Sequence, residues 1–269
     1  MQYDPIKRSL GNVFNKSPFL RKVFYNLLDL LLLRSWHIHK QLKAWEKTIQ
    51  NSSPAILDAG AGFGQYSFWM AKRNPKATIL AVDVKSEQVE DCNAFMKSIS
   101  FNHVKFEVAD LLEYKKSGTY DLILSVDVME HILEDTLVFR NFHESLKKGG
   151  MLLISTPSDQ GGSDAHDEDD ASFIEEHVRN GYNIKEIEDK LRDSGFSKVE
   201  VNYSYGKPGQ IAWRFSMKYP ILALGATKLF FLILPFYYLF FYPICFVLNY
   251  LDTNFKHSTG TGLIVKAWK

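Results

Sequence analysis

The sequence has little cysteine and almost no net charge, and each shortage excludes a class of protein. Its two cysteines, Cys92 and Cys245, lie far apart and match no metal or redox spacing. This usage is typical of a reducing cytoplasm. The formal charge of +1 over 269 residues gives no electrostatic reason to expect nucleic acid as a partner.

A secretory leader is also not expected at the start of the chain. The leucine-rich segment 27–33 follows Arg21 and Lys22, contains Asp29, and is followed by no small-residue cleavage site. Its pattern favours an amphipathic helix, and we expect residues 1–50 to form helices that pack on a core domain.

From residue 51 onward, short apolar runs alternate with helical patterns. Nearly continuous apolar runs separated by helix-length segments predict a parallel sheet covered on both faces, a doubly wound α/β fold. Strands are expected at 55–57, 77–84, 104–108, 120–128, 151–156, 198–205 and 262–268, and helices at about 66–73, 86–98, 137–146 and 184–194. Glycines at 149–150 and 195 are expected where helices end and strands begin.

A glycine-rich loop, Asp58-Ala59-Gly60-Ala61-Gly62-Phe63-Gly64, stands between the first strand and the first core helix. Glycine permits positive φ angles and lets a ligand lie against the main chain. The free N–H groups at the following helix start suit a polar or anionic group. By itself this pattern also fits an ordinary strand-to-helix turn.

Two aspartates add to the glycine loop. Asp83 ends the second strand, where a carboxylate can accept hydrogen bonds from both hydroxyls of a ribose, although it also fits a cap for the next helix. Asp110 ends the third strand, near where an adenine amino group would lie. Such strand ends converge on the crevice where open α/β sheets bind ligands. A nicotinamide oxidoreductase is the weaker alternative, because its G-x-G-x-x-G motif requires glycine where Gln65 stands.

Together with YDLILSVDVMEHI at 120–132 and LKKGGMLLISTP at 146–157, these motifs resemble class I S-adenosylmethionine-dependent methyltransferases, in the branch that includes small-molecule and quinone methyltransferases. The resemblance implies a Rossmann-like, seven-stranded, mostly parallel sheet whose last strand is antiparallel. It also implies S-adenosyl-L-methionine as cofactor, with the methionine part on the glycine loop, the ribose on Asp83 and the adenine facing Asp110. The predicted cofactor contacts are Asp58, Ala59, Gly60, Ala61, Gly62, Gly64, Tyr66, Asp83, Val84, Asp110, Leu111 and Ser125.

The predicted catalytic residues are Asp127, Glu130, His131 and His177. The first three follow the fourth strand, beside the expected methyl position, and a base is needed there when the acceptor is a hydroxyl or a protonated amine. Histidine titrates near neutrality, so His131 is a candidate base, with a structural role in closing the loop as the alternative. His177 belongs to an EHVRNGY segment that borders the substrate pocket in the resembling enzymes.

The segment 163–170 is strongly acidic but has no regular ligand spacing. We expect a solvated lid there and no metal site, and we expect Arg179 to brace it.

Residues 209–258 form an apolar insertion between the last two strands, which leaves residues 51–208 and 259–269 for the cofactor-binding domain. Residues 229–248 carry no charge and match the length of a membrane span. If the flanking strands pair in one sheet, both ends of the insertion lie in one compartment. Pro235 and Pro243 are expected to bend or break a helix in this segment. Basic and aromatic residues flank it: Lys207, Arg214, Lys218, Lys228, Lys256, Trp213, Tyr219, Tyr237, Tyr238, Tyr242 and Tyr250.

The sequence therefore predicts monotopic attachment to the cytoplasmic face of a membrane. A dimer interface, a cover for the substrate pocket and a spanning helix remain as alternatives for the insertion. The predicted function is methyl transfer, with O-methylation favoured, to a small lipophilic acceptor such as a lipid, polyketide or isoprenoid quinone precursor. The rival from another class is a membrane-tethered protein that binds the cofactor without turnover. A homo-oligomer stays open, and nucleic acid is not expected.

Overall fold

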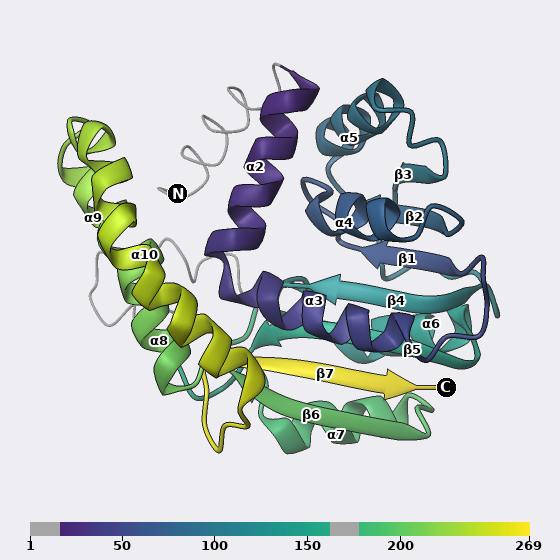
Figure 1. Cartoon of the computed structure of the whole chain (residues 1–269). Helices are drawn as coiled ribbons and strands as arrows, with labels where there is room; N and C mark the ends of the chain where they lie inside the picture. The colour runs from purple at the N-terminus through teal and green to yellow at the C-terminus, as the bar shows by residue number, and fades with distance from the viewer. Residues whose placement is uncertain (1–16, 162–177) are drawn as a thin grey trace.

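The computed structural model describes residues 17–161 and 178–269, which form one seven-stranded sheet with helices on both faces (Figure 1). The strand order is β3-β2-β1-β4-β5-β7-β6, and β7 runs antiparallel to both β5 and β6. The strands are β1 (Ala55–Ala59), β2 (Thr78–Asp83), β3 (Val104–Val108), β4 (Tyr120–Val126), β5 (Leu146–Pro157), β6 (Lys198–Ser204) and β7 (Gly262–Trp268). The predicted fold class is confirmed.

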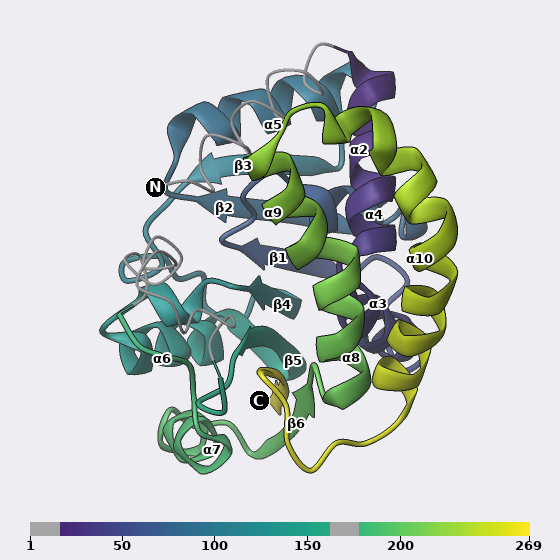
Figure 2. The ribbon, with the colours of Figure 1, turned by 90° about the vertical axis from the view of Figure 1, so that its left-hand side faces the viewer.

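Alternating side chains of the strands build two cores, one on each face of the sheet. Ile56 and Leu122 point toward the first core, under the helices α2 (Pro18–Leu31), α3 (Leu33–Glu46), α4 (Gln65–Arg73) and α5 (Ser86–Ser98). Leu57 and Ile123 point toward the second, under α6 (Asp135–Ser145) and α7 (Ile184–Asp193). Figure 2 shows these two helical layers on opposite sides of the strands. The period of two along each strand therefore places apolar side chains on both faces.

The predicted strand near residue 151 begins earlier than expected. Helix α6 ends at Ser145 and β5 starts at once at Leu146, so Gly149 and Gly150 lie within the strand rather than before it. The register with β4 shifts between Tyr120 and Leu122, where the glycines let the chain bulge.

The apolar insertion is a helical hairpin across the carboxyl ends of the strands (Figures 1 and 2). One arm consists of α8 (Lys207–Trp213), a π-helical turn η3 (Arg214–Lys218) and α9 (Tyr219–Ala226), and α10 (Phe230–Asn254) returns as the other arm. Tyr237 and Tyr238 hydroxyls donate to the carbonyls of Phe215 and Ser216, each at 2.7 Å. These two tyrosines therefore join the arms instead of serving as free membrane anchors.

Pro235 and Pro243, which were expected to bend or break a helix, do not break it. Helix α10 runs unbroken for 25 residues through Pro235 and Pro243, and the chain reverses at residues 227–229 instead. Each proline removes only one main-chain donor, and packing of α10 against α8 and η3 keeps the remaining turns together.

A buried carboxylate fixes the hairpin to the core. Asp252 on α10 has no exposed surface and accepts hydrogen bonds from the main-chain N–H of Tyr205 (3.1 Å) and of Gly209 (3.0 Å). Two histidines also contact it: His37 Nε2 of α3 lies 2.8 Å from Oδ1, and His257 Nε2 lies 3.3 Å from Oδ2. Because this one side chain joins α3, α10 and the start of α8, the insertion has a fixed position beside the strand ends.

Candidate active site

The glycine loop between β1 and α4 lies at the carboxyl ends of the central strands. Gly60, Gly62 and Gly64 have φ angles of 78°, 50° and 76°, which side chains disfavour. A Cβ on Gly60 would lie 2.3 Å from Val128 Cγ2, whereas one on Gly62 would meet nothing within 4 Å. The loop is therefore packed tightly against the β4 end at Gly60 and opens to free space at Gly62.

Asp83, at the end of β2, ties the glycine loop to the neighbouring strand. Its Oδ2 accepts a hydrogen bond from Gly62 N at 2.8 Å, and its Oδ1 accepts one from Lys85 N at 3.0 Å. The carboxylate thus contacts both the loop and the residue before α5. Each oxygen has a second lone pair, so the group can still accept hydrogen bonds from a ligand's hydroxyls.

Several of the predicted cofactor contacts have buried side chains. Asp58 is 2% exposed and its Oδ2 accepts a hydrogen bond from Ser67 Oγ of α4 at 2.6 Å. Burial, and then the charge of Asp83, raise the pKa of Asp58 to about 6. Ser125 is fully buried, and its Oγ makes no hydrogen bond with the described residues. Asp58 therefore orients α4 behind the loop.

Other predicted cofactor contacts differ in how far they are exposed. Val84 is 63% exposed, and Asp110 is exposed with its Oδ1 accepting from Leu112 N at 2.9 Å. Leu111 and Tyr66 are buried, and the Tyr66 hydroxyl lies 3.3 Å from Ser35 Oγ of α3. Asp110 and Val84 are therefore accessible to a ligand at the strand ends, whereas the Leu111 side chain is buried and its carbonyl accepts a hydrogen bond from Asn141 Nδ2 at 3.0 Å.

The predicted catalytic residues after β4 face different surroundings. Glu130, in the 3-10 turn η1 (Met129–His131), is 1% exposed and accepts a hydrogen bond from Thr156 Oγ1 at 3.1 Å. Burial raises the pKa of the Glu130 carboxyl to about 7. His131 is exposed, so the two neighbours do not act as one buried pair. His177 and the acidic run 163–170 lie outside the described residues.

Arg34 of α3 is a site residue that sequence reasoning missed. Its guanidinium pairs with Asp127, and its main-chain N–H donates to the Tyr205 hydroxyl at 3.1 Å. Asp127 and Tyr205 both have positive φ, 52° and 53°. Such backbone strain in non-glycine residues is uncommon and clusters at functional sites. No local motif marks Arg34, because its partner lies 93 residues away in sequence.

The N-terminal helix α2 supports the glycine loop from outside. Arg21 Nη2 donates to Phe63 O at 3.2 Å, and the Tyr25 hydroxyl donates to the same carbonyl. Arg21 is 3% exposed and also pairs with Asp91 at 2.6 Å. Since both side chains come from α2, the loop's conformation depends on a helix that precedes β1 in the sequence.

Arg179 has a partner that the sequence did not indicate. Its predicted partner, the acidic run, lies outside the described residues. Arg179 pairs with Asp135, and its Nη2 donates to Ile132 O at 2.7 Å. Tyr182 and Lys190 also bond Asp135, at 2.7 and 2.8 Å. Arg179 therefore fixes the turn between β4 and α6, beside Glu130.

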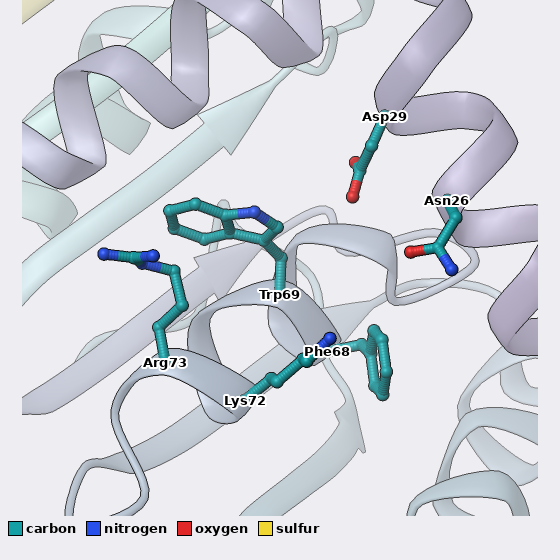
Figure 3. Close-up of a pocket in the computed structure, with 6 residues that line it drawn as sticks. All are labelled: Asn26, Asp29, Phe68, Trp69, Lys72 and Arg73. Atoms are coloured by element: carbon teal, nitrogen blue, oxygen red, sulfur yellow. The ribbon is translucent and has the colours of Figure 1, made fainter.

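A pocket of about 420 Å³ lies between α2 and α4, away from the glycine loop (Figure 3). Asp29 of α2 points toward Trp69 of α4 across this pocket. The glycine loop lies before the start of α4, and the lining residues come from both helices: Asn26, Asp29, Phe68, Trp69, Lys72 and Arg73. Neither Asp83 nor a residue of the glycine loop lines this pocket.

Comparison with known proteins identifies the family. Residues 50–198, more than half of the chain, match the model of the methyltransferase domain. This chain belongs to that family. It is 34% identical over 148 residues to phosphoethanolamine N-methyltransferase 1 of Triticum aestivum, which covers 54% of this chain and 28% of that protein. It is 28% identical over 118 residues to the malonyl-[acyl-carrier protein] O-methyltransferase of Priestia megaterium, covering 44% of this chain and 42% of the relative.

Among solved structures, the fold is similar to that of Haemonchus contortus phosphoethanolamine N-methyltransferase 2 in complex with S-adenosyl-L-methionine. The TM-score is 0.61 at 19% identity, over 86% of this chain and 52% of that one. The predicted class, a class I S-adenosylmethionine-dependent methyltransferase, is confirmed, and the nicotinamide alternative is not supported. The chain spans less than a third of the length of the wheat relative, and relatives with N- and O-directed activities both match.

Proposed function

We propose that this protein transfers the methyl group of S-adenosylmethionine to the oxygen of a small lipophilic acceptor, at the cytoplasmic surface of a membrane. The observation that carries the transfer activity is the Asp83 carboxylate bonded at 2.8 Å to Gly62 N, at a loop that opens to free space. In this proposal Asp83 binds the ribose and the loop holds the methionine part of the cofactor.

Methyl transfer from a sulfonium is an in-line displacement, so positioning accounts for much of the rate. Arg34 and Asp127 supply that positioning in our proposal, because their pair fixes the strained end of β4 beside the loop. A hydroxyl acceptor must also lose a proton. The Glu130 carboxyl, whose pKa burial raises to about 7, and the exposed His131 are the groups on this turn suited to accept it. These groups fit a hydroxyl acceptor, and they would serve a protonated amine in the same way.

The hairpin supports the membrane location. Helix α10 is the one helix, within residues 17–161 and 178–269, long and apolar enough to cross a membrane, and only 6% of its most apolar window is buried. Leu232 and Phe240 are each 71% exposed, and Phe236 is 65% exposed. An apolar surface of this extent on a monomer marks an interaction site.

The geometry favours a position in the membrane surface over a span. Both arms of the hairpin return to one sheet, through β6 and β7, so its two ends share a compartment. Lys228 lies in the turn between α9 and α10, and a charge carried to the bilayer centre is costly. We therefore propose that α10 lies along the interface, with Tyr219 and Tyr250, 45% and 56% exposed, at headgroup depth.

The activity is tested by incubating the purified chain with methyl-labelled S-adenosylmethionine and a lipid extract. We expect release of S-adenosylhomocysteine and label in the organic phase, and fragmentation of the labelled product in mass spectrometry should place the methyl group on oxygen. Asp83→Ala should abolish both, while Asp193→Ala, on α7 behind the sheet, should leave both unchanged. Tight S-adenosylhomocysteine binding without turnover on any extract would favour the non-catalytic, membrane-tethered alternative.

Membrane attachment is tested separately by vesicle flotation. Phe236→Asp combined with Phe240→Asp should abolish flotation and leave cofactor affinity unchanged. A concentration-dependent dimer that these substitutions dissociate, with no flotation of the unaltered chain, would assign the surface of α10 to self-association instead.

A further inference from the structure

Helix α3 carries a row of lysines on one side. Lys40, Lys43 and Lys47 are three and four residues apart and therefore share a face of the helix, on which Trp36 lies one turn earlier. They line a groove of about 690 Å³ together with Asp29, His39, Ala44, Thr48, Thr253 and Asn254. We call this surface the α3 groove.

The α3 groove is positively charged. Lys43 and Lys47 are exposed and make no ion pair with residues in the described part of the chain, while Lys40 Nζ donates to Thr253 O at 2.6 Å. His39 stacks on Trp69, and burial lowers its pKa to about 3, so it carries no charge at neutral pH.

An acid also borders the α3 groove, but its charge is partly satisfied. Asp29 Oδ1 accepts from Gln65 Nε2 at 2.6 Å and lies 3.4 Å from His39 Nε2. The ammonium groups therefore outnumber the carboxylates that line this groove, and an anion is the ligand that fits it.

The α3 groove adjoins the outward apolar surface of α10. Trp36 packs edge-on against Phe246 of α10, with ring centroids 4.9 Å apart. Asn254, at the groove, follows Tyr250 and Val247 by one and two turns on the same side of α10, and these two are 56% and 55% exposed. Figure 1 shows α3 and α10 on the same side of the sheet. A flat partner that covers α10 would therefore reach the lysines as well.

We propose that the α3 groove binds the phosphate of an anionic phospholipid in the membrane on which α10 rests. This inference depends on the membrane location proposed above. The lysine ammonium groups donate hydrogen bonds to the phosphate oxygens, and the Trp36 ring lies at the depth of the headgroups. Two separate contacts, one apolar and one ionic, then fix a single orientation of the protein on the membrane.

The test compares flotation with vesicles of phosphatidylcholine and with vesicles of phosphatidylcholine and phosphatidylglycerol in equal parts, at low salt. The unaltered chain should bind the anionic vesicles more tightly. Lys43→Gln combined with Lys47→Gln should weaken that binding by about 30-fold, because each lysine near an anionic surface contributes about 1 kcal/mol. Binding to phosphatidylcholine alone should change little.

The matched control is Lys148→Gln combined with Lys185→Gln, which removes the same charge at exposed positions outside the groove. It should keep the preference for anionic vesicles, and both double variants should keep the cofactor affinity of the unaltered chain. Equal losses in the two double variants, or a preference that survives Lys43→Gln/Lys47→Gln, would overturn the inference. If the unaltered chain floats with neither kind of vesicle, the membrane location itself fails.

Discussion

We expect replacement of Gly62 by alanine to lower both the stability of the protein and its affinity for the cofactor, and the matched replacement of Gly118 to lower the stability alone. Gly62 and Gly118 have similar positive φ angles, 50° and 58°, and a Cβ added to either meets nothing within 4 Å. A side chain in this left-handed region costs about 1–2 kcal/mol. The loss of freedom in the unfolded chain offsets about 0.4–1 kcal/mol of that cost. Each variant should therefore lose about 1 kcal/mol of stability, or about 2–4 °C in Tm.

The two variants should differ in cofactor binding. Gly62 lies in the loop, with its N–H bonded to Asp83, whereas Gly118 lies between β3 and β4, far along the chain from the loop. Because a ligand must lie against the loop's main chain, the new methyl group at position 62 occupies space that the ligand needs. We expect Gly62→Ala to weaken S-adenosylhomocysteine binding at least tenfold, about 1.4 kcal/mol, in isothermal titration calorimetry. Gly118→Ala should bind like the unaltered chain.

Urea denaturation of both variants establishes that they are folded at the temperature of the titration. Equal affinities for all three proteins would refute the placement of the cofactor on this loop. A large loss of stability in Gly62→Ala alone would refute the reading that its Cβ enters open space.

Three further predictions concern charged groups. Burial raises the Glu130 pKa from 4.5 to about 7, so the folded state binds this proton more tightly and the stability of the unaltered chain falls as pH rises between these values. In denaturation experiments, Glu130→Gln should therefore be up to about 3 kcal/mol more stable than the unaltered chain at about pH 8, but not at about pH 4.5. A gain in stability that does not depend on pH would contradict this. The side chains of the Arg34–Asp127 pair are 32% and 33% exposed, so Arg34→Met should cost under about 1 kcal/mol of stability. The same substitution should lower the rate of methyl transfer at least about tenfold, and an unchanged rate would exclude a positioning role for Arg34. Asp252→Ala leaves two buried N–H groups unpaired, so it should lower the free energy of unfolding in urea by about 3 kcal/mol and speed proteolysis of residues 207–254. A loss of stability below about 1 kcal/mol would show that packing alone fixes the hairpin.

The sequence alone determined the parts of this protein that depend on local pattern. Side chains along a strand alternate between the two faces of the sheet, so each apolar run specifies which of its residues face each core. Three of the segments have the bounds predicted from the sequence: Ser86–Ser98, Val104–Val108 and Gly262–Trp268. The glycine loop and Asp83 were equally readable, because strands of a parallel sheet bring their carboxyl ends to one edge. Chemistry carried by residues at consecutive strand ends is therefore visible without a structure.

Only the tertiary structure decided the contacts between elements far apart in sequence. Arg34 meets Asp127 and Tyr205 because α3 packs across the sheet against β5, and no spacing in the chain encodes that packing. Helix α10 continues through its prolines because the energy of packing against the other arm exceeds the loss of two main-chain bonds. Local preference sets which segments become helices and strands, but the free energy of burying their surfaces sets how they meet.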